Sequence, residues 1–229
     1  MLEELKKKVF DANLALVKYN LVIFTWGNVS QIDRKSGLVV IKPSGVGYDN
    51  MTAEDMVVVD LDGRVVEGRY KPSSDTATHI ELYKAFGAVG GITHTHSTFA
   101  TGYAQSCKSL ECLGTTHADY FYGAVPCTRP LTKDEIATEY ERNTGLVIAA
   151  AFAGKDPMSC PAVLVGSHGP FAWGVDAVSS VEASVVLEEI ARMATITRGI
   201  NPKITPCDSY LMDKHYFRKH GKDSYYGQK

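Results

Sequence analysis

The segment over residues 90–97 constrains the fold most, because it is a short apolar run that ends in two histidines one residue apart. A run of this length next to glycines is typical of a β-strand. Residues two apart point to the same face of a strand, so His94 and His96 would hold their imidazoles side by side. The pair is either a pair of metal ligands or two polar residues on a solvated face, and other parts of the chain must decide.

The composition fits one ordinary globular domain over residues 1–229, since 45% of the residues are hydrophobic and 22% are charged. The 24 basic and 26 acidic residues leave a formal net charge of -2. The sequence has no basic block or stripe, so nucleic acid and anionic membranes are not expected partners. A small ligand is the expected partner.

The first residues and the cysteines favour a cytoplasmic protein. The chain opens with acids before lysines, and no stretch approaches the length of a membrane span. An odd number of scattered cysteines is a poor disulfide framework and agrees with a reducing compartment. We therefore interpret the five cysteines as structural: Cys107, Cys112, Cys127, Cys160 and Cys207.

Hydrophobic periodicity predicts an α/β domain. Helices are expected from Ser74 or Asp75 to residue 86, and over residues 2–20, 132–153, 176–199 and 209–221. Strands are expected over residues 24–32, 37–42, 56–60, 64–67, 162–165 and 171–173. The first third should be mostly antiparallel sheet, because the turns at 33–36 and 62–63 both favour hairpins.

Two further residues fit the metal interpretation. His168 precedes Gly169 and Pro170 at a strand end, where a tight turn would hold its imidazole, so it is the natural third ligand. Asp75 could add a carboxylate or could simply cap the helix that starts beside it, and spacing alone favours neither. Three imidazoles leave a position open for substrate, as in catalytic sites. Zinc is expected, with manganese or cobalt as alternatives.

Two short stretches are suited to a phosphate. Residues 42–45 supply the cation of Lys42, a hydroxyl and a glycine amide after a strand. Ser73 and Ser74 supply hydroxyls and amides at a helix N-terminus. Each stretch alone is also an everyday turn sequence, but together they could hold a phosphate dianion.

Short motifs spread along the whole chain form a consistent set. They are Trp26-Gly-Asn-Val-Ser30, Ile41-Lys-Pro-Ser-Gly45, Pro72-Ser-Ser-Asp75, His94-Thr-His-Ser97, Gly114-Thr-Thr-His-Ala-Asp-Tyr-Phe121, His168-Gly-Pro-Phe-Ala-Trp-Gly174, Lys214-His-Tyr and Tyr225-Tyr-Gly-Gln228. In these motifs the chain resembles the class II aldolase/adducin family in register over essentially its whole length. The block at 114–121 and the terminal block are typical of the family's epimerase branch.

The resemblance implies a fold and an activity. The fold would be a single domain with a central, mainly antiparallel sheet and helices on both faces. The activity would be a metal-dependent epimerisation that interconverts L-ribulose 5-phosphate and D-xylulose 5-phosphate by cleaving and re-forming the C3–C4 bond. Such a reaction serves the breakdown of L-arabinose or L-ascorbate. The family also implies a homotetramer with sites at subunit interfaces.

The resemblance also assigns site residues. The Zn²⁺ ligands would be His94, His96, His168 and Asp75. The sugar phosphate would be held by Gly27, Asn28, Lys42, Ser44, Gly45, Ser73 and Ser74. Asp119 and Tyr226 would be the acid/base pair, supported by Thr115, Glu141 and His215. His215 and Tyr226 would come from a neighbouring chain.

Two other functions remain as alternatives. The first is a sister aldolase that cleaves a ketose phosphate such as L-fuculose 1-phosphate. Asp75 argues against it, because the family's aldolases carry a glutamate at that position. The second is a non-enzymatic adducin-like module, which would lack the metal-ligand histidines. The remaining histidines are predicted to be structural or solvated: His79, His117 and His220.

Overall fold

The computed structural model describes residues 2–221 and 224–225. Over these residues the strands form one seven-stranded sheet in the order β4-β3-β2-β1-β5-β7-β6, and neighbouring strands are antiparallel. The strands are β1 (Asn28–Asp33), β2 (Leu38–Ile41), β3 (Val57–Val59), β4 (Val65–Glu67), β5 (Gly91–His94), β6 (Ala162–Leu164) and β7 (Pro170–Gly174). The predicted antiparallel sheet is confirmed, and the histidine strand β5 lies inside it.

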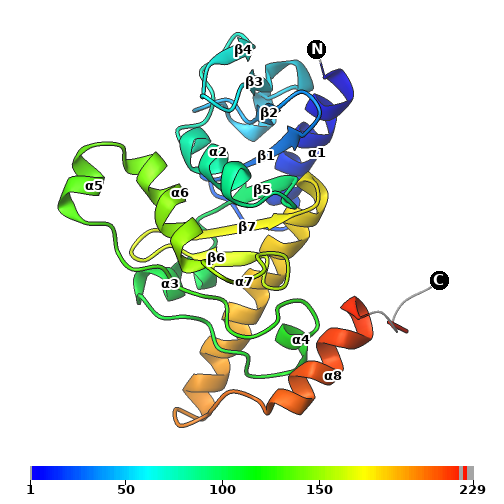
Figure 1. Cartoon of the computed structure of the whole chain (residues 1–229), viewed down its shortest axis with the longest axis vertical. Helices are drawn as coiled ribbons and strands as arrows, with labels where there is room; N and C mark the ends of the chain where they lie inside the picture. Colours follow the sequence, from blue (N-terminus) through cyan, green and yellow to red (C-terminus); the bar gives the residue numbers. More distant parts are fainter. Residues whose placement is uncertain (1, 222–223, 226–229) are drawn as a thin grey trace.

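Helices connect and cover the strands. They are α1 (Glu3–Lys18), α2 (Thr76–Ala85), α3 (Thr98–Gln105), α4 (Thr115–Ala118), α5 (Lys133–Ala137), α6 (Tyr140–Ala151), α7 (Ala177–Ile200) and α8 (Ser209–His220), with 3-10 turns η1 (Tyr48–Asn50) and η2 (Ala53–Asp55). Figure 1 shows them arranged around the sheet. Among the described residues, no helix is both long enough and apolar enough to cross a lipid bilayer.

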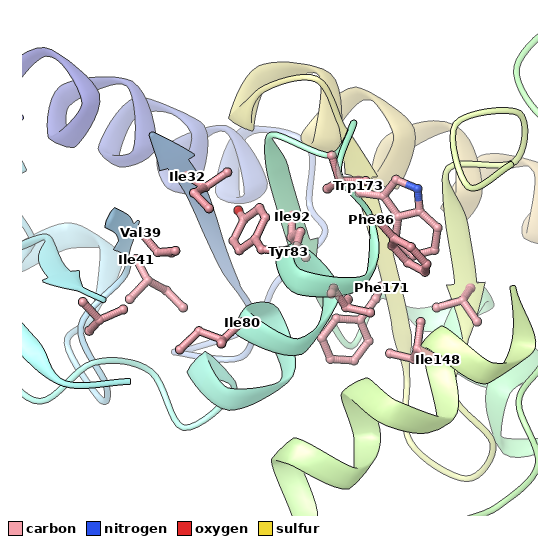
Figure 2. Close-up of a cluster of buried hydrophobic side chains, with 14 of the residues drawn as sticks. Ile32, Val39, Ile41, Ile80, Tyr83, Phe86, Ile92, Ile148, Phe171 and Trp173 are labelled. Atoms are coloured by element: carbon pink, nitrogen blue, oxygen red, sulfur yellow. The ribbon is translucent and has the colours of Figure 1, made fainter. Parts of the chain in front are cut away.

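Each face of the sheet carries its own layer of helices. Val39 and Ile41 of β2 belong to a cluster with side chains of α2 and α6, which Figure 2 shows. Val40, between them, belongs to a second cluster with Leu16 of α1 and Val181 of α7. Side chains alternate between the faces of a strand, so consecutive buried valines and isoleucines require apolar partners on both sides. The predicted helices on both faces are confirmed.

The long helix predicted over residues 132–153 is wrong, because the structure has two helices there. A capping box at Thr132 starts α5. The helix then stops where the Thr138 hydroxyl donates to the Asp134 carbonyl and the Asn143 amide donates to the Glu135 carbonyl, each at 2.9 Å. Such side-chain bonds offer the backbone an alternative to helical pairing. The chain resumes as α6 at Tyr140, a position that the continuous helix would not have singled out.

The last helix packs against a short one at the opposite end of the molecule from β4. Figure 1 shows α8 beside α4, below the sheet. Neither α3 nor α4 was expected from the sequence. We call residues 112–122 and 207–221 the α4–α8 unit.

Candidate active site

Three histidines converge at the end of β5. The ring centroids of His94 and His96 are 5.0 Å apart. The ring centroid of His168 lies 4.9 Å from that of His94 and 5.2 Å from that of His96. Each ring offers a nitrogen, and these three nitrogens lie within 4.8 Å of one another. The predicted convergence of the three imidazoles is confirmed, although β5 itself ends at His94 and the second histidine follows it.

The sheet sets the orientation of the first histidine. His94 pairs across β5 and β7 with Phe171, and its ring stacks on that phenyl ring at 4.1 Å between centroids. Its Nδ1 lies 2.9 Å from the Pro170 carbonyl oxygen, so Nδ1 carries the proton and donates it. The lone pair of Nε2 then faces His96, whose Nε2 is 3.2 Å away.

His168 reaches the cluster from the turn between β6 and β7. The turn is closed by hydrogen bonds between the backbones of Val165 and both Gly169 and His168, and Ser167 takes a left-handed conformation with φ of 63°. This is the tight turn that the sequence predicted. The imidazole Nδ1 lies 3.3 Å from the Tyr140 hydroxyl at the start of α6.

The cluster fits a divalent cation. Burial, with a further contribution from the neighbouring His94 and His96, lowers the pKa of His168 to about 4. Burial also lowers the pKa of His96. The rings of His96 and His168 are therefore neutral at pH 7, the state in which imidazole binds a metal. A held Nδ1 proton on one ligand is the usual support of such a centre.

Asp75 lies in the same pocket but outside the group of converging nitrogens. It precedes α2, where its side chain makes no capping hydrogen bond. Its Oδ2 instead accepts a hydrogen bond from Asn28 Nδ2 at 2.7 Å. Burial raises the pKa of Asp75, but His94, His79 and the Asn28 bond outweigh this, so the pKa falls below its usual value. The carboxylate is ionised, and its part as a fourth ligand stays a prediction.

The two phosphate-binding candidates come together at the other end of the pocket. The Ser44 amide donates to the Lys71 carbonyl, and the Ser73 amide donates to the Lys42 carbonyl, at 2.9 and 3.0 Å. Lys42 is 2% exposed, and its Nζ donates to the Val46 carbonyl at 2.7 Å. Burial lowers the pKa of this ammonium to about 8. An anion that bound here would favour the charged form.

One cavity of about 660 Å³ joins the two ends. The predicted site residues that line it are Gly27, Asn28, Lys42, Ser44, Gly45, Ser73, Ser74, Asp75, His94, His96, Glu141 and His168. Trp26 and Tyr140 line it too, although neither is among the predicted site residues. Trp26 stands beside Gly27 in a motif already singled out, whereas Tyr140 had no local signal.

Gly27 and Asn28 serve the cavity in different ways. Gly27 has φ of +99°, and an added Cβ would lie 2.8 Å from the His94 carbonyl oxygen, so only glycine lets this loop approach β5. Asn28 is buried, and its Oδ1 has no hydrogen-bond partner among the described residues. This oxygen is an acceptor available to a ligand hydroxyl.

Asp119 does not line this cavity. It ends α4 and contacts α8, with Oδ1 3.0 Å from His215 Nδ1 and Oδ2 2.8 Å from Arg218 Nη2. Burial raises the pKa of Asp119, but the bonds from Arg218 and His215 outweigh it and lower the pKa on balance. Thr115 also lies in the α4–α8 unit, and Tyr226 lies outside the described residues.

The expectation that His215 reaches the site from a neighbouring chain stays a prediction, and the structure brings His215 into contact with Asp119 of its own chain. The contact forms because α8 packs on α4, which brings together charges far apart in the sequence. The other histidines behave as predicted. His79 is buried against the Ser30 hydroxyl, His117 Nε2 lies 2.8 Å from the Gly123 carbonyl, and His220 is exposed.

Comparison with known proteins places these features in a family. The family model described as the Class II Aldolase and Adducin N-terminal domain matches residues 7–195. Two curated relatives named L-ribulose-5-phosphate 4-epimerase UlaF, from Salmonella paratyphi B and Salmonella typhi, are each 59% identical over 228 residues. They match over the full length of both chains.

Solved structures show the same fold. An L-fuculose 1-phosphate aldolase has a TM-score of 0.81 at 24% identity, over 95% of this chain and 96% of that chain. The L-fuculose-1-phosphate aldolase of Thermus thermophilus has a TM-score of 0.68 at 24% identity, over 89% and 98%. With the family match over most of its length, the chain belongs to the class II aldolase/adducin family.

Proposed function

We propose that the chain is a metal-dependent L-ribulose-5-phosphate 4-epimerase, an isomerase. Relatives of that name share 59% of its residues over the full length. In the structure, the observation that carries the proposal is one cavity with the histidine cluster at one end and Lys42 with its serines at the other. A phosphorylated ketopentose has matching ends, a ketone with neighbouring hydroxyls and a phosphate.

The reaction explains why an epimerase has the fold of an aldolase. In L-ribulose 5-phosphate the carbonyl is C2, which acidifies the proton on C3 but not the proton on C4. Direct deprotonation therefore cannot invert C4. Cleavage of the C3–C4 bond gives an enediolate and glycolaldehyde phosphate. If the aldehyde turns its other face before the bond re-forms, the product is D-xylulose 5-phosphate.

The residues of the cavity divide this work. A divalent ion held by His94, His96 and His168, with Asp75 as a further ligand, would supply Lewis-acid stabilisation of the charge that develops on the C2 and C3 oxygens. Lys42, with Ser44, Gly45, Ser73 and Ser74, holds the phosphate so that the aldehyde turns without leaving. Asn28 accepts a substrate hydroxyl through its unpaired Oδ1. Gly27 and Glu141 also line the cavity.

Proton transfer at the C4 oxygen needs one group on each face, and we assign it to Asp119 and Tyr226. Arg218 and His215 hold Asp119 ionised, so it accepts a proton first and returns it afterwards. Because Asp119 lies outside the cavity of its own chain, the α4–α8 unit must serve the cavity of another copy. We therefore propose a homotetramer with shared sites, in which Asp119, Thr115 and His215 arrive together.

Three finer points belong to the same proposal. The ion is Zn²⁺, with Mn²⁺ or Co²⁺ as alternatives for a site with nitrogen and oxygen ligands. Residues 1–229 act as one catalytic domain in the breakdown of L-arabinose or L-ascorbate. A cytoplasmic location stays a prediction from the sequence.

The test is a coupled assay of purified protein with L-ribulose 5-phosphate, in which D-xylulose 5-phosphate is followed with and without a chelator. We expect product formation that the chelator abolishes and that added Zn²⁺ restores. Folded, zinc-loaded protein that forms no product would contradict the proposal. Net release of glycolaldehyde phosphate and dihydroxyacetone in place of epimer would favour a sister aldolase.

The second candidate is cleavage of a ketose phosphate such as L-fuculose 1-phosphate. It is favoured only by the shared fold of the L-fuculose 1-phosphate aldolase structure. The same preparation tests it, with dihydroxyacetone phosphate as the measured product. The adducin-like module has less support, because a non-catalytic domain has no need of three converging imidazoles.

A further inference from the structure

Two cysteines of the α4–α8 unit lie next to each other. The Sγ atoms of Cys112 and Cys207 are 3.6 Å apart, although the residues are separated by 95 positions in the sequence. Both are free thiols. Nothing in the sequence predicted that they would meet, and neither takes part in the epimerase chemistry proposed above.

The backbones at this pair are also joined. The Cys207 amide donates to the Cys112 carbonyl oxygen at 2.9 Å. A backbone hydrogen bond of this kind holds two backbone segments roughly 4.7–4.9 Å apart. The Cα atoms of disulfide-bonded cysteines are usually about 4.4–6.8 Å apart. The sulfurs must approach by roughly 1.5 Å to bond, which is within reach of side-chain rotation.

The two thiols differ in their exposure. Cys112 is 4% exposed, and burial together with the neighbouring Cys207 raises its pKa to about 12. Cys207 is partly exposed. A dissolved oxidant therefore meets Cys207 first, and Cys112 waits behind it as the partner that completes the reaction.

We propose that Cys112 and Cys207 form a reversible disulfide when a peroxide oxidises the protein. The Cys207 thiolate attacks one peroxide oxygen, the O–O bond breaks, and a sulfenic acid and hydroxide form. The Cys112 sulfur then attacks the Cys207 sulfur, the S–O bond breaks, and the hydroxide leaves as water with the Cys112 proton. In total two thiols and one hydrogen peroxide give one disulfide and two waters.

The link would join the starts of two helices. Cys207 precedes Asp208, the N-cap of α8, and Cys112 lies two residues before Gly114, the N-cap of α4. The disulfide would fix α8 to the segment that leads into α4, and with it the arrangement of His215 and Asp119. It also closes a long loop, which restricts the unfolded chain strongly.

The test uses a Cys127→Ser variant, so that a linked peptide identifies Cys112. Without this change Cys112 and Cys127 would share one tryptic peptide, residues 109–133, because trypsin does not cleave the bond before Pro130. The protein is treated with hydrogen peroxide, its remaining thiols are alkylated, and its tryptic peptides are weighed. We expect peptide 109–133 linked to peptide 204–214, with release by dithiothreitol. We also expect Tm to rise by roughly 4 °C or more on oxidation.

The matched control adds Cys112→Ser to the same variant, and this protein should show neither the link nor the rise in Tm. Cys107 is exposed and serves as an internal reference for oxidation. If Cys107 is oxidised while the 112–207 link is absent, or if Cys207 is linked to Cys107, the proposal is wrong. Peptide mass and Tm do not depend on epimerase activity, so this test stands or falls apart from the proposed function.

Discussion

The histidine cavity and the α4–α8 unit are built in opposite ways. In the cavity, strand register places the first histidine: β5 lies between β1 and β7, and the His94 ring is fixed by Phe171 and Pro170. In the α4–α8 unit, side-chain ion pairs do the placing, with Asp119 held by His215 and Arg218 of another helix. The first arrangement is anchored to a sheet through His94, and the second depends on how two helices dock.

This difference suggests that binding of the ion and the phosphate can be separated experimentally from proton transfer. The cavity has the groups for binding an ion and a phosphate, all supplied by one chain. The α4–α8 unit has the groups to which we assign proton transfer, and it lies outside the cavity of its own chain. Changes in the cavity should therefore abolish binding, whereas changes in the unit should abolish turnover and leave binding intact.

The largest effect is expected from His96→Ala. Loss of one of three ring nitrogens should release the ion, and loss of Lewis-acid stabilisation worth several kcal/mol should lower kcat/KM by about 10³-fold or more. Elemental analysis of the dialysed protein and the coupled assay measure the two effects. His117→Ala is the control for a buried histidine outside the cavity, and it should retain the ion. A His96→Ala protein with full metal content would break the comparison.

Asp119→Asn should retain the ion and lose about 10²-fold or more in kcat, because a positioned acid or base contributes that much. Mixing this variant with His96→Ala in hybrid tetramers should restore activity at about a quarter of the sites, if each site takes its cavity and its α4–α8 unit from different chains.

The matched control mixes Asp119→Asn with His215→Asn. These residues meet within one chain, so no hybrid site has both intact and no recovery is expected. Recovery in this control would show that Asp119 and His215 serve one site from different chains, contrary to the contact that the structure shows.

A smaller effect is expected at the phosphate end of the cavity. Lys42→Met should raise KM by about tenfold, since a charge-assisted bond to phosphate is lost, and should change kcat less. The pKa of Lys42 is about 8, so the free enzyme loses this charge as the pH rises through 8. The wild-type KM should therefore rise between pH 8 and 10, and that of Lys42→Met should not. The exposed-lysine variant Lys35→Met should follow the wild type.

The smallest effect on activity is expected at His79, a buried histidine whose ring lies against Phe171 and the Ser30 hydroxyl. Burial lowers the pKa of His79 to about 3, so between pH 6.5 and 3 the unfolded chain binds a proton that the folded protein does not. The free energy of unfolding should therefore fall as the pH is lowered through this range, by about 1.4 kcal/mol per unit for this residue.

His79→Gln removes that contribution. Urea unfolding at pH 7 and pH 5 should show a smaller loss of stability in the variant than in the wild type. At pH 7 the variant should be less stable by about 1 kcal/mol, because the Ser30 hydroxyl loses one of its two partners and keeps Tyr83. Equal pH dependence in both proteins would mean that the His79 ring is protonated in the folded state.

The sequence could predict the cavity because its signals are local. The two-residue spacing predicted that His94 and His96 would lie side by side, and a turn sequence predicted the position of His168. The contacts of Asp119 could not be predicted this way, because its partners His215 and Arg218 lie about a hundred residues away and meet it only when α8 docks. Family resemblance supplied the residues of the α4–α8 unit but not their arrangement.

The fold shows the same limit. The sheet and the outer helices follow from apolar periodicity, which survives folding because burial enforces it. The break between α5 and α6 does not follow, because it depends on single hydroxyl and amide groups that bond to carbonyls one turn away. The family resemblance assigned Asn28 to the sugar phosphate, but it did not predict that the Asn28 amide donates to Asp75.

The break between α5 and α6 offers a way for substrate specificity to change while the histidine cluster stays the same. Tyr140 and Glu141, with which α6 begins, line the cavity. They belong to a helix, however, and not to the strands β5 and β7 that flank the histidines. Inserted or deleted residues before α6 would be absorbed between the two helices, because α6 packs on α2, and would change the side chains presented to the substrate where α6 begins. Related catalysts for other sugar phosphates could thus arise through small length changes over residues 133–139, while the histidine cluster is inherited intact.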